Sequence, residues 1–159
     1  MAGVRNTELK ITVRESMTLD GNKYDHLTSK ILYNINEVSK RVVNIPTSSE
    51  RIELLKVSSS IGAGSHLENE VRYIRLTNLD DTNFVTFTFK NANSDEFAIK
   101  VEKESSFIYN GMSGSGVSNS MEASGSALIS GSFNSLSSVF AKADTSACDV
   151  EYFVASTKQ

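Results

Sequence analysis

The residues best suited to chemistry are the two histidines, His26 and His66, and the second stands in the tripeptide His66-Leu67-Glu68. A His-x-Glu motif belongs to zinc deaminases, in which a Pro-Cys-x-x-Cys segment completes the metal site. The chain has one cysteine, Cys148, and one proline, Pro46, so that segment is missing. Even if both histidines met in the fold, a third strong nitrogen or sulfur ligand would be lacking. We therefore expect no metal and no cofactor.

Glycine and serine clusters raise the question of a hydrolase or a nucleotide-binding loop. A nucleophile elbow needs G-x-S-x-G at a turn from strand to helix. The nearest stretch, Gly111-Met112-Ser113-Gly114-Ser115, lacks the last glycine and precedes no helical pattern. Gly62-Ala63-Gly64 begins like a phosphate loop, but neither nucleotide-binding motif is completed. The sequence thus predicts no catalytic residue, and we expect a protein that is not an enzyme.

The pair Asp80-Asp81 stands between Asn78 and Asn83 and offers several oxygen atoms in one short loop. Calcium takes such ligands, but a dedicated loop spreads its acids at regular spacing around a glycine. Asn and Asp are also the residues that turns prefer. We therefore interpret this loop as a hairpin turn.

Aromatic and basic residues also occur close together, as in proteins that bind single-stranded nucleic acid. Arg72, Tyr73 and Arg75 precede Phe84, Phe87 and Phe89 in the sequence. The isoelectric point of about 5.4 argues against such a partner. Phe87 and Phe89 alternate in phase with Val85, which indicates a buried position. We expect no nucleic-acid binding.

The composition indicates one folded domain, residues 1–159. Apolar residues make up 39%, charged residues 22%, and the net charge is −3, so disorder is not expected. No run approaches the length of about 18 apolar residues that a membrane helix needs. The first residues lack the layout of a signal peptide, and a lone cysteine suits a reducing compartment. We expect synthesis in a cytoplasm and no membrane partner.

Hydrophobic residues alternate with polar ones along much of the chain, which is the pattern of half-buried β-strands. The clearest segments run from Leu9 to Val13, Val85 to Phe89, Phe97 to Val101 and Cys148 to Val154. Weaker strands are expected over 30–35, 38–45, 51–57, 70–76 and 106–109. Turn residues separate the strands, for example Asp20-Gly21-Asn22.

This spacing predicts an all-β fold, an antiparallel β-sandwich of about eight to ten strands. Within it, the strands between residues 70 and 109 are expected to form one antiparallel meander. The sequence divides unevenly in charge: residues 1–75 carry a net +2 and residues 76–159 a net −5. Such polarity would help like subunits meet, although two ordinary solvated faces would give the same numbers.

Residues 111–138 form a long Gly/Ser-rich arm or loop that breaks the strand pattern. Glycine and serine alone would give a flexible loop. Apolar residues are interleaved through it, however, and we favour an arm that becomes ordered against a neighbouring subunit. The candidate interface residues are Met112, Val117, Met121, Leu128, Ile129, Phe133 and Leu136.

Two stretches carry a resemblance to a known group of proteins. One is Val71-Arg72-Tyr73-Ile74-Arg75-Leu76-Thr77-Asn78-Leu79-Asp80 followed by Thr82-Asn83-Phe84-Val85-Thr86-Phe87-Thr88-Phe89. The other is Ser105-Ser106-Phe107-Ile108-Tyr109-Asn110, followed by the Gly/Ser arm and the closing Val150-Glu151-Tyr152-Phe153-Val154-Ala155-Ser156-Thr157. The chain resembles small β-rich virion structural proteins of tailed bacteriophages, of the marine podovirus and cyanophage type. The resemblance covers the second half of the chain best and includes no catalytic motif.

The resemblance implies a non-enzymatic virion protein made in the bacterial host cytoplasm. We expect a capsid decoration, or cement, protein that bridges major capsid subunits and contacts copies of itself. Its expected contact elements are the segment Ala2–Thr7 and the arm at 111–138. The first alternative is a neck, tail-adaptor or fibre-associated virion protein. A more distant one is a carbohydrate-binding β-sandwich module, which the absence of tryptophan disfavours.

Overall fold

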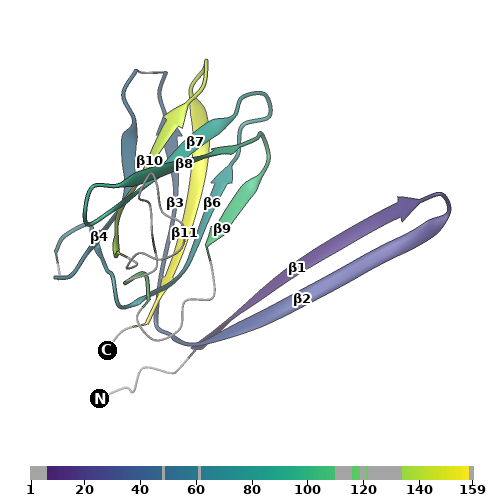
Figure 1. The fold of residues 1–159 in the computed structure, drawn as a ribbon, viewed down its shortest axis with the longest axis horizontal. Coiled ribbons are helices and arrows are strands. Elements are labelled where there is room, and N and C mark those ends of the chain that lie inside the picture. Colours follow the sequence, from purple (N-terminus) through teal and green to yellow (C-terminus); the bar gives the residue numbers. More distant parts are fainter. Residues whose placement is uncertain are drawn as a thin grey trace.

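The computed structural model describes residues 7–47, 49–60, 62–109, 116–118, 121 and 134–157. These residues form a two-layered β-sandwich from which one long β-hairpin projects (Figure 1). The predicted all-β, antiparallel sandwich is confirmed. No helix in these ranges is long and apolar enough to cross a membrane. The strands are β1 (Thr7–Leu19), β2 (Asn22–Ile35), β3 (Glu37–Ile45), β4 (Ile52–Ser58), β5 (His66–Leu67), β6 (Val71–Asn78), β7 (Val85–Asn91), β8 (Glu96–Val101), β9 (Ser106–Tyr109), β10 (Leu136–Ala143) and β11 (Cys148–Ser156).

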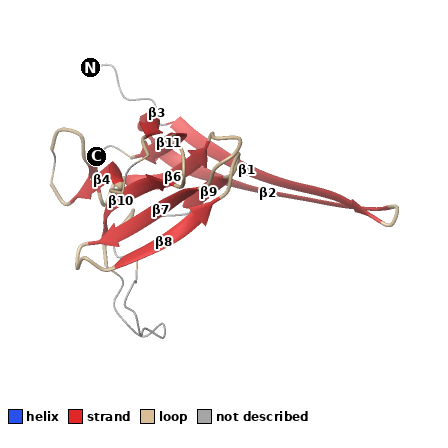
Figure 2. Cartoon of the chain, turned by 90° about the horizontal axis from the view of Figure 1, so that it is seen from above, coloured by secondary structure: helices blue, strands red, loops and turns tan. Residues whose placement is uncertain are grey.

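The sandwich consists of two facing sheets (Figure 2). The first, called here the β7 sheet, has the strand order β5-β4-β10-β7-β8, and the second, the β11 sheet, has the order β3-β11-β6-β9. All pairs are antiparallel except the short β4–β5 contact, which is parallel. The C-terminal strand β11 therefore lies in the middle of its sheet, between two strands from earlier in the chain.

The core lies between the two sheets and follows the alternation seen in the sequence. Val85 and Phe87 on β7 are fully buried, and Phe89 is 1% exposed. Facing them from β11, Val150 and Val154 are equally buried. The side chains between these positions point outwards, as expected for a period of two along each strand. The expectation that Phe87 and Phe89 are core residues is confirmed.

The predicted meander over residues 70–109 is wrong. Strand β6 pairs with β9 in the β11 sheet, whereas β7 pairs with β8 in the β7 sheet. The chain crosses between sheets at the turn after Asn78, whose buried amide nitrogen donates to the carbonyl oxygens of Asn83 at 2.8 Å and Val101 at 3.3 Å. The Asn78 side chain thereby stabilises the turn between the sheets, because it donates hydrogen bonds to carbonyl oxygens that the strand pairing leaves without a partner.

Three of the candidate interface residues belong to the core of the chain itself. Val117 is fully buried, Met121 is 4% exposed and Leu136 is 1% exposed. Leu136 opens β10, a strand that the sequence analysis missed because it assigned residues up to 138 to the arm. The interpretation of these three side chains as contacts to another subunit is therefore wrong. Met112, Leu128, Ile129 and Phe133 lie outside the described residues.

The hairpin β1–β2 is much longer than the sequence indicated. Its strands contain 13 and 14 residues, and they pair with each other and with no other strand among the described residues. Asp20 and Gly21 close it with φ angles of 49° and 80°, the geometry of a type I′ turn. Figure 1 shows the hairpin leaving the base of the sandwich and diverging from it. The predicted turn is confirmed, while both strands extend to meet it.

Candidate interaction surface

The root of the hairpin packs on the outside of the β11 sheet. Ile11, Leu32 and Ile35 are buried there against Tyr73 of β6 and Ala155 of β11. The partly buried Leu9 and Phe153 complete the contact. This small cluster is separate from the main core between the sheets. It fixes the direction in which the hairpin leaves the sandwich.

The hairpin has one apolar and one polar face. Residues paired directly across an antiparallel ladder lie on the same face. The pairs Leu9–Leu32, Val13–Thr28 and Met17–Tyr24 therefore share a face with the buried Ile11. The opposite face is largely hydrophilic and includes the hydroxyl pair Thr12–Ser29 at 3.2 Å and the Ser16 hydroxyl donating to Asp25 at 2.6 Å, although Leu27 and Ile31 interrupt it.

Beyond the root, the apolar face continues, and no described residue from elsewhere in the chain covers it. We call this part the distal stripe, and it comprises Val13, Glu15, Met17, Leu19 and Tyr24. Its hydrophobic members are between 43% (Val13) and 55% (Tyr24) exposed. Large apolar side chains gathered on one exposed face mark an interaction site more often than scattered ones do. The distal stripe is therefore the candidate interaction surface.

A second apolar region lies on the outer face of the β11 sheet. Val38 and Val42 of the edge strand β3 are 54% and 52% exposed. They flank an ion-pair cluster in which Glu151 binds Lys40 at 3.2 Å and also Arg75. Arg75 in turn lies over the Phe153 ring, 5.8 Å from its centroid.

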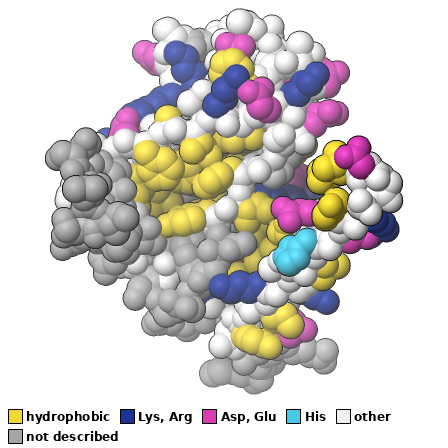
Figure 3. Space-filling view, turned by 45° about the vertical axis from the view of Figure 1, so that its right-hand side comes forward, with side chains coloured by type: hydrophobic (Ala, Val, Ile, Leu, Met, Phe, Trp, Pro, Cys, Tyr) yellow, Lys and Arg dark blue, Asp and Glu magenta, His cyan; other side chains and the backbone are white. Residues whose placement is uncertain are grey.

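An open cleft lies beside the contact between the hairpin root and this sheet. It has a volume of about 370 Å³ and is lined by Leu9, Ile11, Tyr73, Arg75, Ile108 and Phe153 among others. Figure 3 shows hydrophobic side chains at the surface both along the hairpin and on the sandwich beside it. Its lining combines apolar side chains with the cationic side chains of Lys10 and Arg75.

The histidines considered for metal binding do not form a metal site in the described ranges. His26 lies in the distal part of β2, whereas His66 lies on β5 at the edge of the β7 sheet. No group of three or more His, Cys, Asp or Glu residues is placed to hold a metal ion there. Burial lowers the pKa of His66, and the charge of Glu37 opposes this effect. We assign no chemistry to either histidine.

The acidic loop at Asp80 is a turn held by its own side chain. Asp80 Oδ1 accepts hydrogen bonds from the backbone nitrogens of Thr82 at 2.8 Å and Asn83 at 2.5 Å. These bonds favour the charged carboxylate and lower its pKa. The oxygen is thereby used within the loop, which is a turn as the sequence predicted. The prediction of a hairpin turn is wrong, because the loop connects β6 and β7, which lie in different sheets. The glycine loop at 62–64 is likewise a turn, in which the Ser65 hydroxyl donates to the carbonyl oxygen of Gly62 at 3.0 Å.

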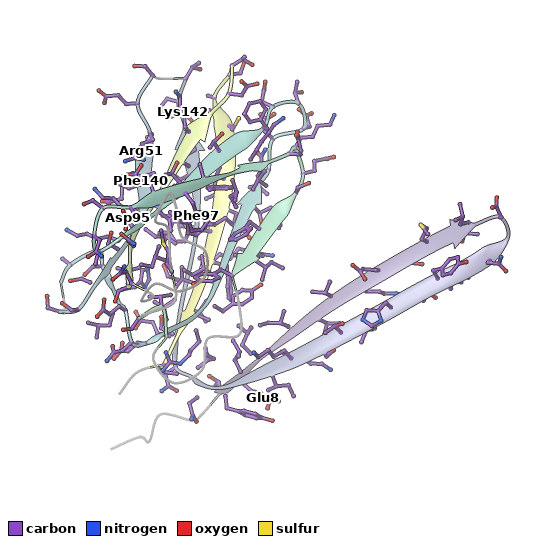
Figure 4. The ribbon with its side chains drawn as sticks, viewed as in Figure 1. Glu8, Arg51, Asp95, Phe97, Phe140 and Lys142 are labelled. Atoms are coloured by element: carbon purple, nitrogen blue, oxygen red, sulfur yellow. The ribbon has the colours of Figure 1, made fainter. Side chains whose placement is uncertain are left out.

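The outer face of the β7 sheet carries a second polar cluster, far from the hairpin. Arg51 donates two hydrogen bonds to Glu96, at 2.7 and 2.6 Å, and lies 4.2 Å from the centroid of the Phe140 ring. Figure 4 places Arg51 and Phe140 together there, with Glu8 at the hairpin root on the other side of the molecule. The partners of Arg51 are all within the chain, so this cluster stabilises the sandwich.

Comparison with known proteins adds little. No family model and no curated protein matches the chain. A solved structure described as "Bacillus endospore appendages form a novel family of disulfide-linked pili" is similar, with a TM-score of 0.43 and 9% identity over 77% of this chain and 88% of that chain. This likeness is too distant to support any functional argument, and the case for function depends on the surface described above.

Proposed function

We propose that this protein is a non-enzymatic structural subunit of a tailed-phage virion, and that it decorates the capsid by binding major capsid subunits. The observation that carries the proposal is the projecting hairpin, whose apolar face is covered only at its root by the residues that the structure describes. The sequence resemblance selects the virion among possible assemblies. The geometry supports the general role of a subunit built for contact.

A two-stranded hairpin without a third strand or a packed face is marginally stable in water. The distal part of this hairpin has neither, yet it exposes Met17, Leu19 and Tyr24 to more than half of their full extent. A partner that covers the distal stripe would remove this apolar surface from water, at roughly 25 cal/mol per Å². Binding energy is therefore available where the chain itself supplies no cover.

The charges of the hairpin suit a contact of this kind. Strands β1 and β2 together hold four basic residues, Lys10, Arg14, Lys23 and Lys30, and three acidic ones, Glu8, Glu15 and Asp25, with Asp20 in the turn making the hairpin neutral. The rest of the chain is acidic, with a net charge of −3 for the whole. A neutral arm approaches a neighbouring protein without the repulsion that an acidic surface meets on a like-charged shell.

The deciding experiment locates the protein on purified particles. Mass spectrometry of the particles and an electron cryo-microscopy reconstruction should find many copies distributed over the icosahedral shell, each touching more than one capsid subunit. A single ring of copies at one vertex would replace decoration by a neck or tail-adaptor role. Absence of the protein from washed particles would overturn the virion assignment altogether.

A binding assay tests whether the hairpin makes the contact. Particles assembled without this protein are incubated with the purified chain and sedimented. Met17→Asp, on the distal stripe, should abolish co-sedimentation because it places a charge in the contact. Thr18→Asp, one residue along on the polar face, is the matched control and should bind like the wild type. Equal binding by both variants would contradict the proposed use of the stripe.

A further inference from the structure

The distal stripe contains one acidic residue whose position calls for a partner. Glu15 is exposed and stands between Val13 and Met17 on the apolar face, opposite His26. It forms no ion pair with any residue in the described ranges of the chain. A cation brought to this carboxylate by a partner would form a charge-assisted hydrogen bond with it.

The outer face of the β11 sheet offers a matching cation. Lys40 and Arg75 share the single carboxylate of Glu151, so this cluster of three charges keeps a net positive charge. The Lys40 side chain is 58% exposed, which leaves its ammonium group accessible to a second acid. On the adjoining strands, the nearest acid of the same face is Asp149, whose carboxylate accepts a hydrogen bond from Asn44 at 2.8 Å.

Strands β1 and β3 carry the same spacing of apolar and charged residues, with charges of opposite sign at the centre. On β1, Val13, Glu15 and Met17 occupy alternate positions of one face. On β3, Val38, Lys40 and Val42 occupy alternate positions of the outer face, paired with Ala155, Phe153 and Glu151. Each set is apolar, charged, apolar over about 13 Å, and the central charges are opposite. Such complementarity fixes the register of a contact as well as its partner.

The hairpin already makes a contact of this kind within the chain. Its root places the same apolar face against Tyr73, Phe153 and Ala155 of the same sheet. The distal stripe cannot reach β3 of its own sheet, because the root holds the hairpin in a direction that diverges from the sandwich (Figure 1). The β3 surface of another molecule has no such restriction. The docking partner that fits is therefore a second copy of this chain.

We propose that the distal stripe of one copy docks on the outer face of the β11 sheet of a second copy, with Glu15 paired to Lys40. The distal stripe is only part of one face of the hairpin, and it covers less than the roughly 800 Å² per partner of a standard interface. A single contact is accordingly weak and depends on protein concentration. The inference goes beyond the proposed function, since contact between copies requires no virion. The same stripe serves both contacts, so on any one hairpin the contact between copies in the free protein and the contact with the capsid exclude each other.

Substitutions that reverse the charges of Glu15 and Lys40 in the purified protein test the proposal. Sedimentation equilibrium should show wild-type mass rising with concentration. Glu15→Lys and Lys40→Glu should each weaken self-association at least about tenfold, because each brings like charges together. An equimolar mixture of the two variants should recover association, since the lysine introduced on the hairpin of one then faces the glutamate introduced on β3 of the other. Thermal unfolding of each variant verifies that it is folded.

Glu8→Lys is the matched control, because it makes the same charge change on the polar face at the hairpin root and should leave association unchanged. Three results would overturn the proposal: a wild-type monomer at every concentration, association unaffected by Glu15→Lys, or no recovery in the mixture. None of these results bears on whether the protein is found on particles. The particle experiment therefore tests the proposed function separately.

Discussion

The sandwich and the hairpin are built from the same strand pattern but differ in what covers it. On β7, Val85, Phe87 and Phe89 face a second sheet of the same chain and are at most 1% exposed. On β1, Ile11 is covered, whereas Val13 and Met17 on the same face are 43% and 53% exposed. Alternation thus specifies a strand with one apolar side, and the fold alone decides whether the chain itself covers that side.

The sharpest test of this difference compares two truncations of apolar side chains. Phe87→Ala removes a fully buried ring from the core and should lower the free energy of unfolding by about 3–5 kcal/mol. Met17→Ala on the distal stripe should change it by no more than about 0.5 kcal/mol. Urea denaturation of dilute protein measures both. Similar losses would mean that the hairpin contributes to the core.

A pair of glycines tests the same difference through the backbone. Gly116 has a φ of 62°, and a Cβ there would lie 2.6 Å from the carbonyl oxygen of Glu68 and 2.8 Å from that of Val71. Gly116→Ala should destabilise the protein by about 2–4 kcal/mol, because strain and overlap combine. Gly21, with a φ of 80° at the hairpin turn, has open space around it.

Gly21→Ala should therefore cost about 1 kcal/mol, and this strain falls on the hairpin alone. Thermal unfolding followed by circular dichroism gives both values. If Gly116→Ala were as mild as Gly21→Ala, the described part of the Gly/Ser segment would not be anchored to the sandwich. We expect this segment to be anchored, because the Val117 nitrogen donates a hydrogen bond to the carbonyl oxygen of Glu68 at 2.7 Å.

Hydrogen exchange should resolve the two regions in one experiment. Amides of β7, paired on both sides by β10 and β8, should exchange only through global unfolding. Amides of the distal hairpin, which has neither a third strand nor a covered face, should exchange by local opening of small free energy. Raising the protein concentration should slow exchange in the distal hairpin and in β3, the two elements of the proposed contact between copies. Uniform protection would contradict the comparison.

The smallest effect concerns His66, at the edge of the sandwich. Because burial lowers its pKa in the folded state, the unfolded chain binds a proton more readily. Stability should therefore fall as the pH drops below about 6.5, the ordinary histidine pKa. His66→Gln should flatten this dependence between pH 7.5 and 5.5, above the range in which Asp80 titrates. An unchanged pH dependence in the variant would remove His66 as its cause.

Sequence alone predicted the fold class because alternation and turns are local. The β10 strand escaped prediction, since Ser137 and Ser138 at its start look like loop residues. In the structure these hydroxyls bond within the chain, Ser138 donating to Glu53 at 2.8 Å and Ser137 to the carbonyl oxygen of Lys90 at 3.0 Å. The prediction of a meander was wrong for a similar reason. Long-range packing decides which sheet a strand joins, and local sequence does not show it.

The candidate surface could be predicted only in part. Leu9, Ile11 and Val13 indicated a strand, but Glu15 interrupts the alternation before Met17 and Leu19 resume it in the same phase. That resumed phase, followed by the Asp20-Gly21 turn, was the available evidence for a long hairpin. Nothing local distinguishes an apolar face covered by the chain from one left open. The assignment of the interface to residues 111–138 was wrong at Val117, Met121 and Leu136 for this reason.

Cys148 has a practical consequence for studying this molecule. It is the only cysteine in the sequence, it is fully buried, and burial raises the pKa of its thiol, so little thiolate forms. Maleimide reagents should leave the native chain almost unlabelled. A cysteine introduced beside the hairpin turn would then be the single reactive position. A fluorophore attached there would report, by its distance to a second labelled copy, where each hairpin lies in an assembly.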